Sequence, residues 1–246
     1  MKDKFSVQSK IYADFRPTYP KELVGYISSY CKERTLAWDV GTGNGQFAFL
    51  LSEYFQKVYA TDLSANQIEN ARQNSKIIYK VEHAEKSNFP DKQFDLITVA
   101  QALHWFNLEK FFTEVNRTLK PKGIFAAIGY SLIKISPDID KVINDFYTNV
   151  IGKYWDPERK LVDEKYKNIH FPFNEITNNK HFKITGDWTI NNLEGYLNSW
   201  SAVQNFIKIN NYNPVPKVIK NIIPLLKDKN LFKVKFPIFM RIFRLI

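Results

Sequence analysis

The stretch AWDVGTGNGQFAFLL, from Ala37 to Leu51, places three alternating glycines between two apolar segments. The first segment reads as a short buried strand and the second has helical spacing, so Gly41, Gly43 and Gly45 lie on a strand-to-helix turn. Without a Cβ atom, this backbone can adopt positive φ and let a ligand lie directly against it. In an open parallel sheet, the first such turn is the usual place for a nucleotide-like cofactor. The stretch therefore predicts a cofactor-binding turn.

Strand-like and helix-like segments alternate along the chain around this turn. Strands are expected at residues 35–40, 57–62, 77–84, 94–100 and 123–130, and helices at 21–32, 45–55, 64–75 and 107–120. Such alternation indicates parallel strands joined by right-handed crossovers. The segment from Phe232 to Arg241 alternates apolar and polar residues with period two, which predicts one more strand rather than a membrane helix.

Composition sets the outer limits of the function. With 246 residues, of which 44% are hydrophobic, the chain can bury one good core. Its net charge of +10 is spread over the whole length without a block of like charges, so a nucleic-acid partner is given little weight. Cys31 is the only cysteine, which excludes an internal disulfide framework and a cysteine metal cluster. No signal peptide and no membrane span are recognised, so a cytoplasmic protein without a membrane partner is expected.

The spacing of the glycines separates two cofactor classes. The dinucleotide fingerprint is G-x-G-x-x-G/A, whereas this turn reads G-x-G-x-G, and Gln46 stands where the third small residue belongs. Asp62 ends the next expected strand, where a carboxylate can accept hydrogen bonds from both ribose hydroxyls of an adenosine. The alternative for Asp62 is a charge at the start of a helix that Ser64 caps.

Four successive motifs carry a resemblance to a known family. DVGTGNGQ, ATDLS, HAEKSNFPDKQFDLITVAQALHWF and LKPKG resemble those of class I S-adenosylmethionine-dependent methyltransferases. IYADFRPTYP and LEGYLNSWSAVQ resemble the small-molecule branch typified by trans-aconitate methyltransferase. The resemblance extends from Phe5 to about Gln204, and only residues 131–181 give little to align.

We therefore predict an α/β fold, a Rossmann-like doubly wound seven-stranded sheet that is mostly parallel, with an antiparallel last strand and a helical cap. The chain, 1–246, is expected to be a single methyltransferase domain. Its expected parts are an N-terminal lid and helix, a cofactor-binding core, a helical cap with the substrate region, and the final sheet strand, at residues 1–32, 33–130, 131–222 and 223–246.

The resemblance implies S-adenosyl-L-methionine as the cofactor and assigns roles near the glycine turn. Gly41 and Gly43 would let the methionine part lie along the turn, and Asp39 would hold its amino group directly or through water. Asp62 would bind the ribose hydroxyls, and Leu63 would pack on the adenine.

The resemblance also implies roles for residues farther from the turn. Ala84 and Glu85 would bind the adenine edge, although Glu85 could instead be a surface residue. Gln101 would contact the methionine end. Tyr12 and Arg16 would close over the cofactor carboxylate as a lid. The alternatives are a surface salt bridge for Arg16 and core packing for Tyr12.

The chemistry of methyl transfer bears on the acceptor site. A carboxylate acceptor needs no base, whereas a hydroxyl would want one, and His104 is the histidine beside the expected cofactor end. His104 could equally shape the pocket or hydrogen-bond the substrate. Trp105 and Trp200 are expected to contact the substrate, while Trp155 and Trp188 could line the pocket or form the core of the cap. No metal is expected.

The residues after the fourth strand also narrow the acceptor class. AQALHW stands at the position where amino methyltransferases have the motif D/N-P-P-Y. The chain also has no Pro-Cys pair that could attack cytosine. Methyl transfer to a small-molecule acceptor, with a carboxylate or hydroxyl oxygen favoured, is therefore the expected function. A cofactor-binding regulator without catalysis and an RNA-modifying methyltransferase remain alternatives. The identity of the acceptor and the oligomeric state are left open.

Overall fold

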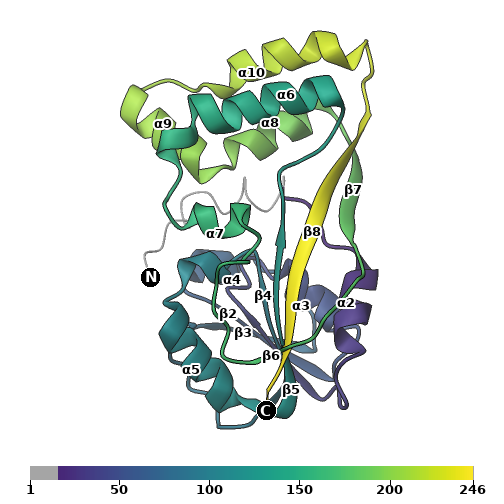
Figure 1. Ribbon diagram of the computed structural model, residues 1–246, viewed down its shortest axis with the longest axis vertical. Helices are drawn as coiled ribbons and strands as arrows, with labels where there is room; N and C mark the ends of the chain where they lie inside the picture. Colours follow the sequence, from purple (N-terminus) through teal and green to yellow (C-terminus); the bar gives the residue numbers. More distant parts are fainter. Residues whose placement is uncertain (1–15, 246) are drawn as a thin grey trace.

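A twisted mixed sheet forms the centre of the molecule (Figure 1). The computed structural model describes residues 16–245, so the predicted lid residue Tyr12 lies outside the described residues. Five parallel strands follow the order β3-β2-β1-β4-β5. Their bounds are β1 Leu36–Val40, β2 Lys57–Asp62, β3 Ile77–Val81, β4 Phe94–Ala100 and β5 Leu119–Tyr130. Because the chain runs outward from β1 to β3 and then returns to β4, the topological switch point lies between β1 and β4.

Three antiparallel pairings complete the sheet. The long strand β8, Phe232–Arg244, pairs antiparallel with β5 over its second half. The two-residue strand β6, Asn174–Glu175, and β7, Lys183–Trp188, both pair antiparallel with β8, at its end and over its first half respectively. The predicted Rossmann-like fold, mostly parallel with an antiparallel strand at the end, is therefore confirmed.

Successive side chains of the core strands point to opposite faces of the sheet, and an apolar layer covers each face. Ala37, Leu96 and Ile124 face the layer that holds helices α2, Lys21–Ser28, and α3, Gln46–Leu51. Their chain neighbours Trp38 and Ile97 face the layer that holds α5, Leu108–Thr118. This period of two buries both faces of the parallel strands, as expected for an α/β sheet. The remaining short helix of the core is α4, Ala65–Glu69.

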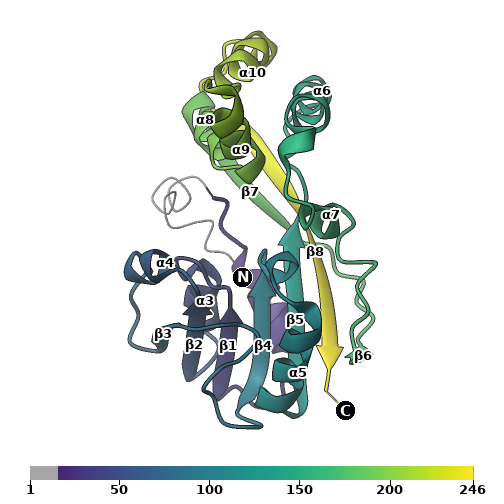
Figure 2. The same ribbon diagram turned by 90° about the vertical axis from the view of Figure 1, so that its left-hand side faces the viewer.

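A helical cap stands over the carboxyl ends of the parallel strands (Figure 2). Its helices are α6 Pro137–Asp145, a π-helical turn Phe146–Val150, α7 Arg159–Asp163, α8 Ile190–Asn198, α9 Ser201–Asn210 and α10 Val215–Ile222, with 3-10 turns at Gly152–Tyr154 and Ile223–Leu226. Strands β7 and β8 extend as a paired arm from the core to the cap, and α7 lies between the two parts. The cap therefore lies over the edge at which parallel α/β sheets bind ligands.

Two structural findings bear on partners. Within residues 16–245, no helix has both the length and the apolar character required to cross a membrane. The same residues hold no cluster of three or more His, Cys, Asp or Glu side chains suited to a metal ion.

Candidate cofactor and acceptor sites

The three glycines of the turn differ in what surrounds them. All have positive φ, at 66° for Gly41, 56° for Gly43 and 80° for Gly45, a region that other residues rarely adopt. A Cβ atom on Gly41 would lie 2.6 Å from the Cβ atom of Ala102, and one on Gly45 would meet a tyrosine ring of β3. A Cβ atom on Gly43 would have its nearest heavy atom 3.9 Å away. Gly41 and Gly45 therefore allow close packing within the protein, whereas a Cβ atom on Gly43 would meet a single atom at ordinary van der Waals distance.

Asp39 fastens the turn to the sheet. Its carboxylate accepts hydrogen bonds from the hydroxyl of Thr42 at 2.6 Å and from that of Thr98, on the neighbouring strand β4, at 2.7 Å. Burial raises the pKa of Asp39 to about 6, and the two threonine hydroxyls oppose that rise. Asp39 is therefore a carboxylate that titrates close to neutral pH at the mouth of β1.

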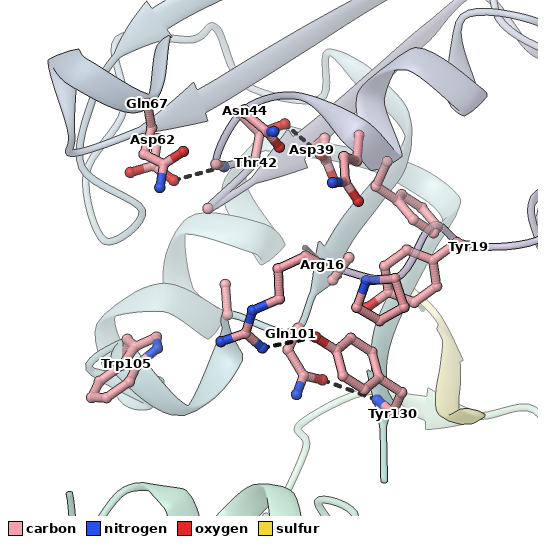
Figure 3. A pocket seen from close by; sticks show the side chains of 17 residues that line it. Arg16, Tyr19, Asp39, Thr42, Asn44, Asp62, Gln67, Gln101, Trp105 and Tyr130 are labelled. Carbon is pink, nitrogen blue, oxygen red and sulfur yellow. Dashed lines mark hydrogen bonds between the residues drawn. The ribbon is translucent and has the colours of Figure 1, made fainter. Parts of the chain in front are cut away.

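Asp62 points at the turn from the end of β2 (Figure 3). Its Oδ2 atom accepts a hydrogen bond from the backbone N–H of Gly43 at 2.8 Å, and its Oδ1 atom accepts one from the N–H of Ser64 at 3.0 Å. The Ser64 hydroxyl in turn caps α4 by accepting from the N–H of Gln67. The carboxylate facing the turn and the serine cap are therefore both present.

A first cavity of about 800 Å³, including its open mouth, lies over the carboxyl ends of the central strands. Of the predicted cofactor residues, the cavity is lined by Arg16, Asp39, Gly41, Gly43, Asp62 and Gln101. Sequence reasoning did not name several other lining residues, which include Tyr19, Asn44, Gln67 and Tyr130.

Three predicted cofactor residues do not line this cavity. Leu63, Ala84 and Glu85 are absent from its walls as the structure describes them. Ala84 is buried, and the Glu85 carboxylate accepts a hydrogen bond from the backbone N–H of Asn107 at 3.0 Å. Their roles at the adenine remain predictions.

A second cavity of about 440 Å³, including its open mouth, adjoins the first. Both cavities are lined by Arg16, Gln101 and Trp105, so these side chains mark the boundary between them. The other walls of the second cavity are formed by His104, Trp155, Arg159, Trp200 and Ser201. The structure therefore brings the predicted residues Arg16, His104, Trp105 and Trp200 together from distant parts of the chain.

Gln101 sits at this boundary in a constrained conformation. Its φ is 59°, in the left-handed region, and its backbone N–H donates to the carbonyl of Ile128 at 2.8 Å. Its side-chain oxygen accepts from the backbone N–H of Tyr130 at 3.0 Å, so the side chain is fixed by β5. Non-glycine residues with such backbone angles are often found at functional sites.

Arg16 joins the core to the cap. One terminal nitrogen donates to the Tyr130 hydroxyl at 2.9 Å, and the other donates to the carbonyl of Ser199 at 3.1 Å, just after α8. Its guanidinium carbon also lies 5.7 Å from the centre of the Tyr196 ring. In Figure 3, Arg16, Gln101 and Tyr130 lie on the wall opposite Asp39 and Asp62.

His104 is buried in the wall of the second cavity. Its Nδ1 atom lies 3.4 Å from the Tyr166 hydroxyl. Burial lowers the pKa of His104 to about 3, and the positive charges of Arg159 and Arg16 add to the effect. The imidazole is therefore neutral near pH 7 and a weak proton acceptor, which favours hydrogen bonding over general-base catalysis.

Arg159 is a wall residue that sequence reasoning missed. It begins α7, and its guanidinium carbon lies 4.8 Å from the centre of the Trp155 ring. A single arginine in a charged segment gives no signal in sequence, and residues 131–181 offered no motif to align. Of the two cap tryptophans left open, Trp155 lines the second cavity, whereas Trp188 packs against Tyr196 and Phe236.

Known proteins share both the core and the cap. The family model for a methyltransferase domain matches residues 38–127, which contain the glycine turn, Asp62 and Gln101. A Dictyostelium discoideum protein assigned as a methyltransferase is 40% identical over 246 residues, covering 97% of this chain and 93% of its own. The Saccharomyces cerevisiae protein CRG1, assigned as an S-adenosylmethionine-dependent methyltransferase, is 25% identical, covering 84% of this chain and 83% of its own.

A solved structure shows the same arrangement. A protein from Anaeromyxobacter dehalogenans, assigned as a type II methyltransferase, superposes with a TM-score of 0.86 at 32% identity. The match covers 94% of this chain and 98% of that one, so it includes the cap as well as the sheet.

Proposed function

Because the chain belongs to the class I S-adenosylmethionine-dependent methyltransferases, we propose that it methylates an oxygen of a small-molecule acceptor bound in the second cavity. The observation that carries this proposal is that Arg16, Gln101 and Trp105 line both cavities, so the two cavities lie side by side. A carboxylate is the favoured acceptor group, as in the trans-aconitate branch that the sequence resembles.

The first cavity fits the cofactor of this family. Gly43 leaves room for a ligand against the backbone, and the Asp62 carboxylate lines the same cavity, where it would bind the ribose hydroxyls. Asp39 adds a carboxylate at the mouth of β1 that suits an ammonium group. When bound, S-adenosylmethionine supplies a methyl group that its sulfonium already activates.

The walls of the second cavity favour an acceptor that is already ionised. A hydroxyl acceptor must lose a proton during transfer, and the buried His104, with its pKa near 3, is poorly suited to take it. Among the described residues that line this cavity there is no Asp or Glu. A carboxylate acceptor needs no proton transfer, so these walls suffice for it.

The remaining contribution of the protein is alignment in a water-poor site. Arg16 ties β5 to the cap through Tyr130 and Ser199, and Gln101 is fixed by the same strand. Holding the acceptor in line with the methyl group replaces much of the entropy that a bimolecular reaction would lose. Apolar walls from Trp155 and Trp200 exclude water from the reacting groups.

The test is a product assay with the purified chain. The protein is incubated with S-adenosylmethionine and a panel of carboxylic acids, alcohols and amines, and S-adenosylhomocysteine and methylated products are measured by mass spectrometry. We expect methyl esters of some acids, formed in equal amount with S-adenosylhomocysteine. Cofactor binding without any product would indicate a regulator, and methylation of RNA alone would indicate an RNA-modifying enzyme; either result would contradict the proposal.

A further inference from the structure

The second cavity contains two guanidinium groups that are engaged in different ways. Both terminal nitrogens of Arg16 donate to protein oxygens, one on the core and one on the cap. Arg159 is held through its Nε atom, which donates to the Tyr147 hydroxyl at 2.9 Å and to Asp163 at 3.2 Å. In residues 16–245 no oxygen accepts a hydrogen bond from the two terminal nitrogens of Arg159. Arg159 is therefore the guanidinium that can bind a ligand.

The surroundings of Arg159 hold it in one orientation. The Tyr147 hydroxyl donates to both oxygens of Asp163, at 2.7 and 2.9 Å, while accepting from Arg159. The Trp155 ring lies against the guanidinium, and the Arg159 side chain is only 18% exposed. Burial lowers the pKa of Arg159, but Tyr147 and Asp163 raise it above its ordinary value, so the group stays charged. A fixed, charged fork matches the geometry of a carboxylate.

The walls around this fork are positive and aromatic. Arg16 and Arg159 supply two positive charges, and no acidic side chain of the described chain lines the cavity. The indole rings of Trp105, Trp155 and Trp200 provide the apolar surface. The terminal nitrogens of Arg159 can donate to an anion in this cavity without breaking the bonds that its Nε atom makes to Tyr147 and Asp163. This combination selects an anion with an apolar body.

We propose that the acceptor is an aromatic carboxylic acid whose carboxylate binds the two terminal nitrogens of Arg159 and whose body packs against the tryptophans. Arg159 is then the specificity-determining residue of the acceptor site, and Tyr147 and Asp163 are positioning residues. This inference rests on the proposed function, because it takes the second cavity as the acceptor site.

Charge loss accompanies the reaction of such an acceptor. A carboxylate oxygen forms the new bond to the methyl carbon while the bond from that carbon to sulfur breaks and its electron pair returns to sulfur. No proton moves, and the sulfonium and the carboxylate both become neutral. The ester product therefore lacks the charge that Arg159 binds, which favours its release.

The test compares charged and neutral versions of one ligand. Protein saturated with S-adenosylhomocysteine is titrated by calorimetry with three acid and amide pairs: benzoate and benzamide, cinnamate and cinnamamide, and indole-3-acetate and its amide. Methyl cinnamate and phenyl phosphate are added as further probes. We expect at least one acid to bind tenfold or more tightly than its amide, and methyl cinnamate to bind as weakly as cinnamamide.

Variants assign that preference to one residue. Arg159→Gln should reduce the preference for the acid to nearly one, and Arg159→Lys should keep part of it, because the charge remains and the fork is lost. Tyr147→Phe should weaken acid binding severalfold by releasing the Nε atom. The matched control is Lys160→Gln, which removes one positive charge from the next position of α7, where the side chain is 79% exposed. Lys160→Gln should leave the preference unchanged, and affinity for S-adenosylhomocysteine reports folding of every variant.

Several results would overturn the inference. The inference fails if wild-type protein binds every amide as tightly as the matching acid. It also fails if Arg159→Gln protein keeps the wild-type preference for the acid. Tighter binding of phenyl phosphate than of all three carboxylates would overturn the assignment to carboxylic acids. An acid preference that depends on Arg159, without methylation of any acid, would retain the anion site and reject the proposed function. Methylation of neutral acceptors alone would keep the methyltransferase activity and reject the anion site at Arg159.

Discussion

A single methyl group added at Gly43 should separate cofactor binding from folding. In Gly43→Ala, the new Cβ atom lies at van der Waals distance, 3.9 Å, from its nearest heavy atom, so no neighbour has to move. The φ of 56° places alanine in the left-handed region, which costs roughly 1–2 kcal/mol of stability. The same Cβ atom occupies the room in which the cofactor would approach the backbone. We expect affinity for S-adenosylmethionine to fall at least tenfold, which corresponds to about 1.4 kcal/mol.

Gly41→Ala is the matched control on the same turn. Its φ of 66° carries a similar backbone cost, but its Cβ atom would lie 2.6 Å from the Cβ atom of Ala102 and 3.1 Å from the Phe106 ring. Overpacking adds about 1–3 kcal/mol to the loss of stability. Denaturant unfolding should therefore rank Gly41→Ala below Gly43→Ala in stability, while calorimetry measures cofactor affinity. Wild-type cofactor affinity in a folded Gly43→Ala protein would refute the assignment of the space beside the Gly43 backbone to the cofactor.

Three further predictions concern the ionisable groups. Asp62→Asn should weaken binding of S-adenosylmethionine by about 1.5–3 kcal/mol in calorimetry, because charge-assisted hydrogen bonds are lost; unchanged affinity would count against the ribose contact. Since the pKa of Asp39 is raised to about 6, cofactor affinity should fall as the pH drops below 6, and Asp39→Asn should remove that dependence. The folded pKa of His104, about 3, lies below its ordinary value of 6.5, so the stability that neutral His104 contributes is lost as the pH falls below 6.5. The free energy of unfolding of wild type, measured with denaturant relative to that of His104→Phe, should fall by about 2 kcal/mol between pH 7 and pH 5. A difference that does not change with pH would contradict the lowered pKa of His104.

The core strands were predictable because each is a short run of mainly apolar residues that is visible in the local sequence. The segments 57–62 and 94–100 form β2 and β4 with the expected bounds. The helix expected at 64–75 ends at Glu69 instead. The backbone N–H of Arg72 donates to the carbonyl of Asn44, and the Arg72 guanidinium stacks on the Phe49 ring. A contact with the glycine turn therefore overrides local helix propensity.

The strands within residues 131–222 were not predictable from local pattern. Strand β6 has two exposed residues, and most side chains of β7 are exposed or half-buried. Both depend on the long strand β8 for their hydrogen bonds, and that pairing joins residues far apart in sequence. Strand propensity is weak without the partner, so a helical cap was the natural expectation.

The candidate site divides in the same way. Its cofactor side follows from spacing, since the glycine turn and Asp62 lie on consecutive elements of the core. Its acceptor side depends on Arg159 and Trp155, which reach the second cavity only because the cap folds over the sheet. No local rule relates those two residues to Gln101, so only the tertiary structure reveals the anion-binding fork.

The most direct test is a crystal structure of the protein with S-adenosylhomocysteine and an aromatic carboxylic acid that binds it. We expect the ribose hydroxyls on Asp62, the thioether sulfur at the boundary formed by Arg16, Gln101 and Trp105, and the acid in the second cavity facing that sulfur. A sulfur atom turned away from this boundary, or an acid bound outside the second cavity, would refute the assignment of the two cavities to cofactor and acceptor.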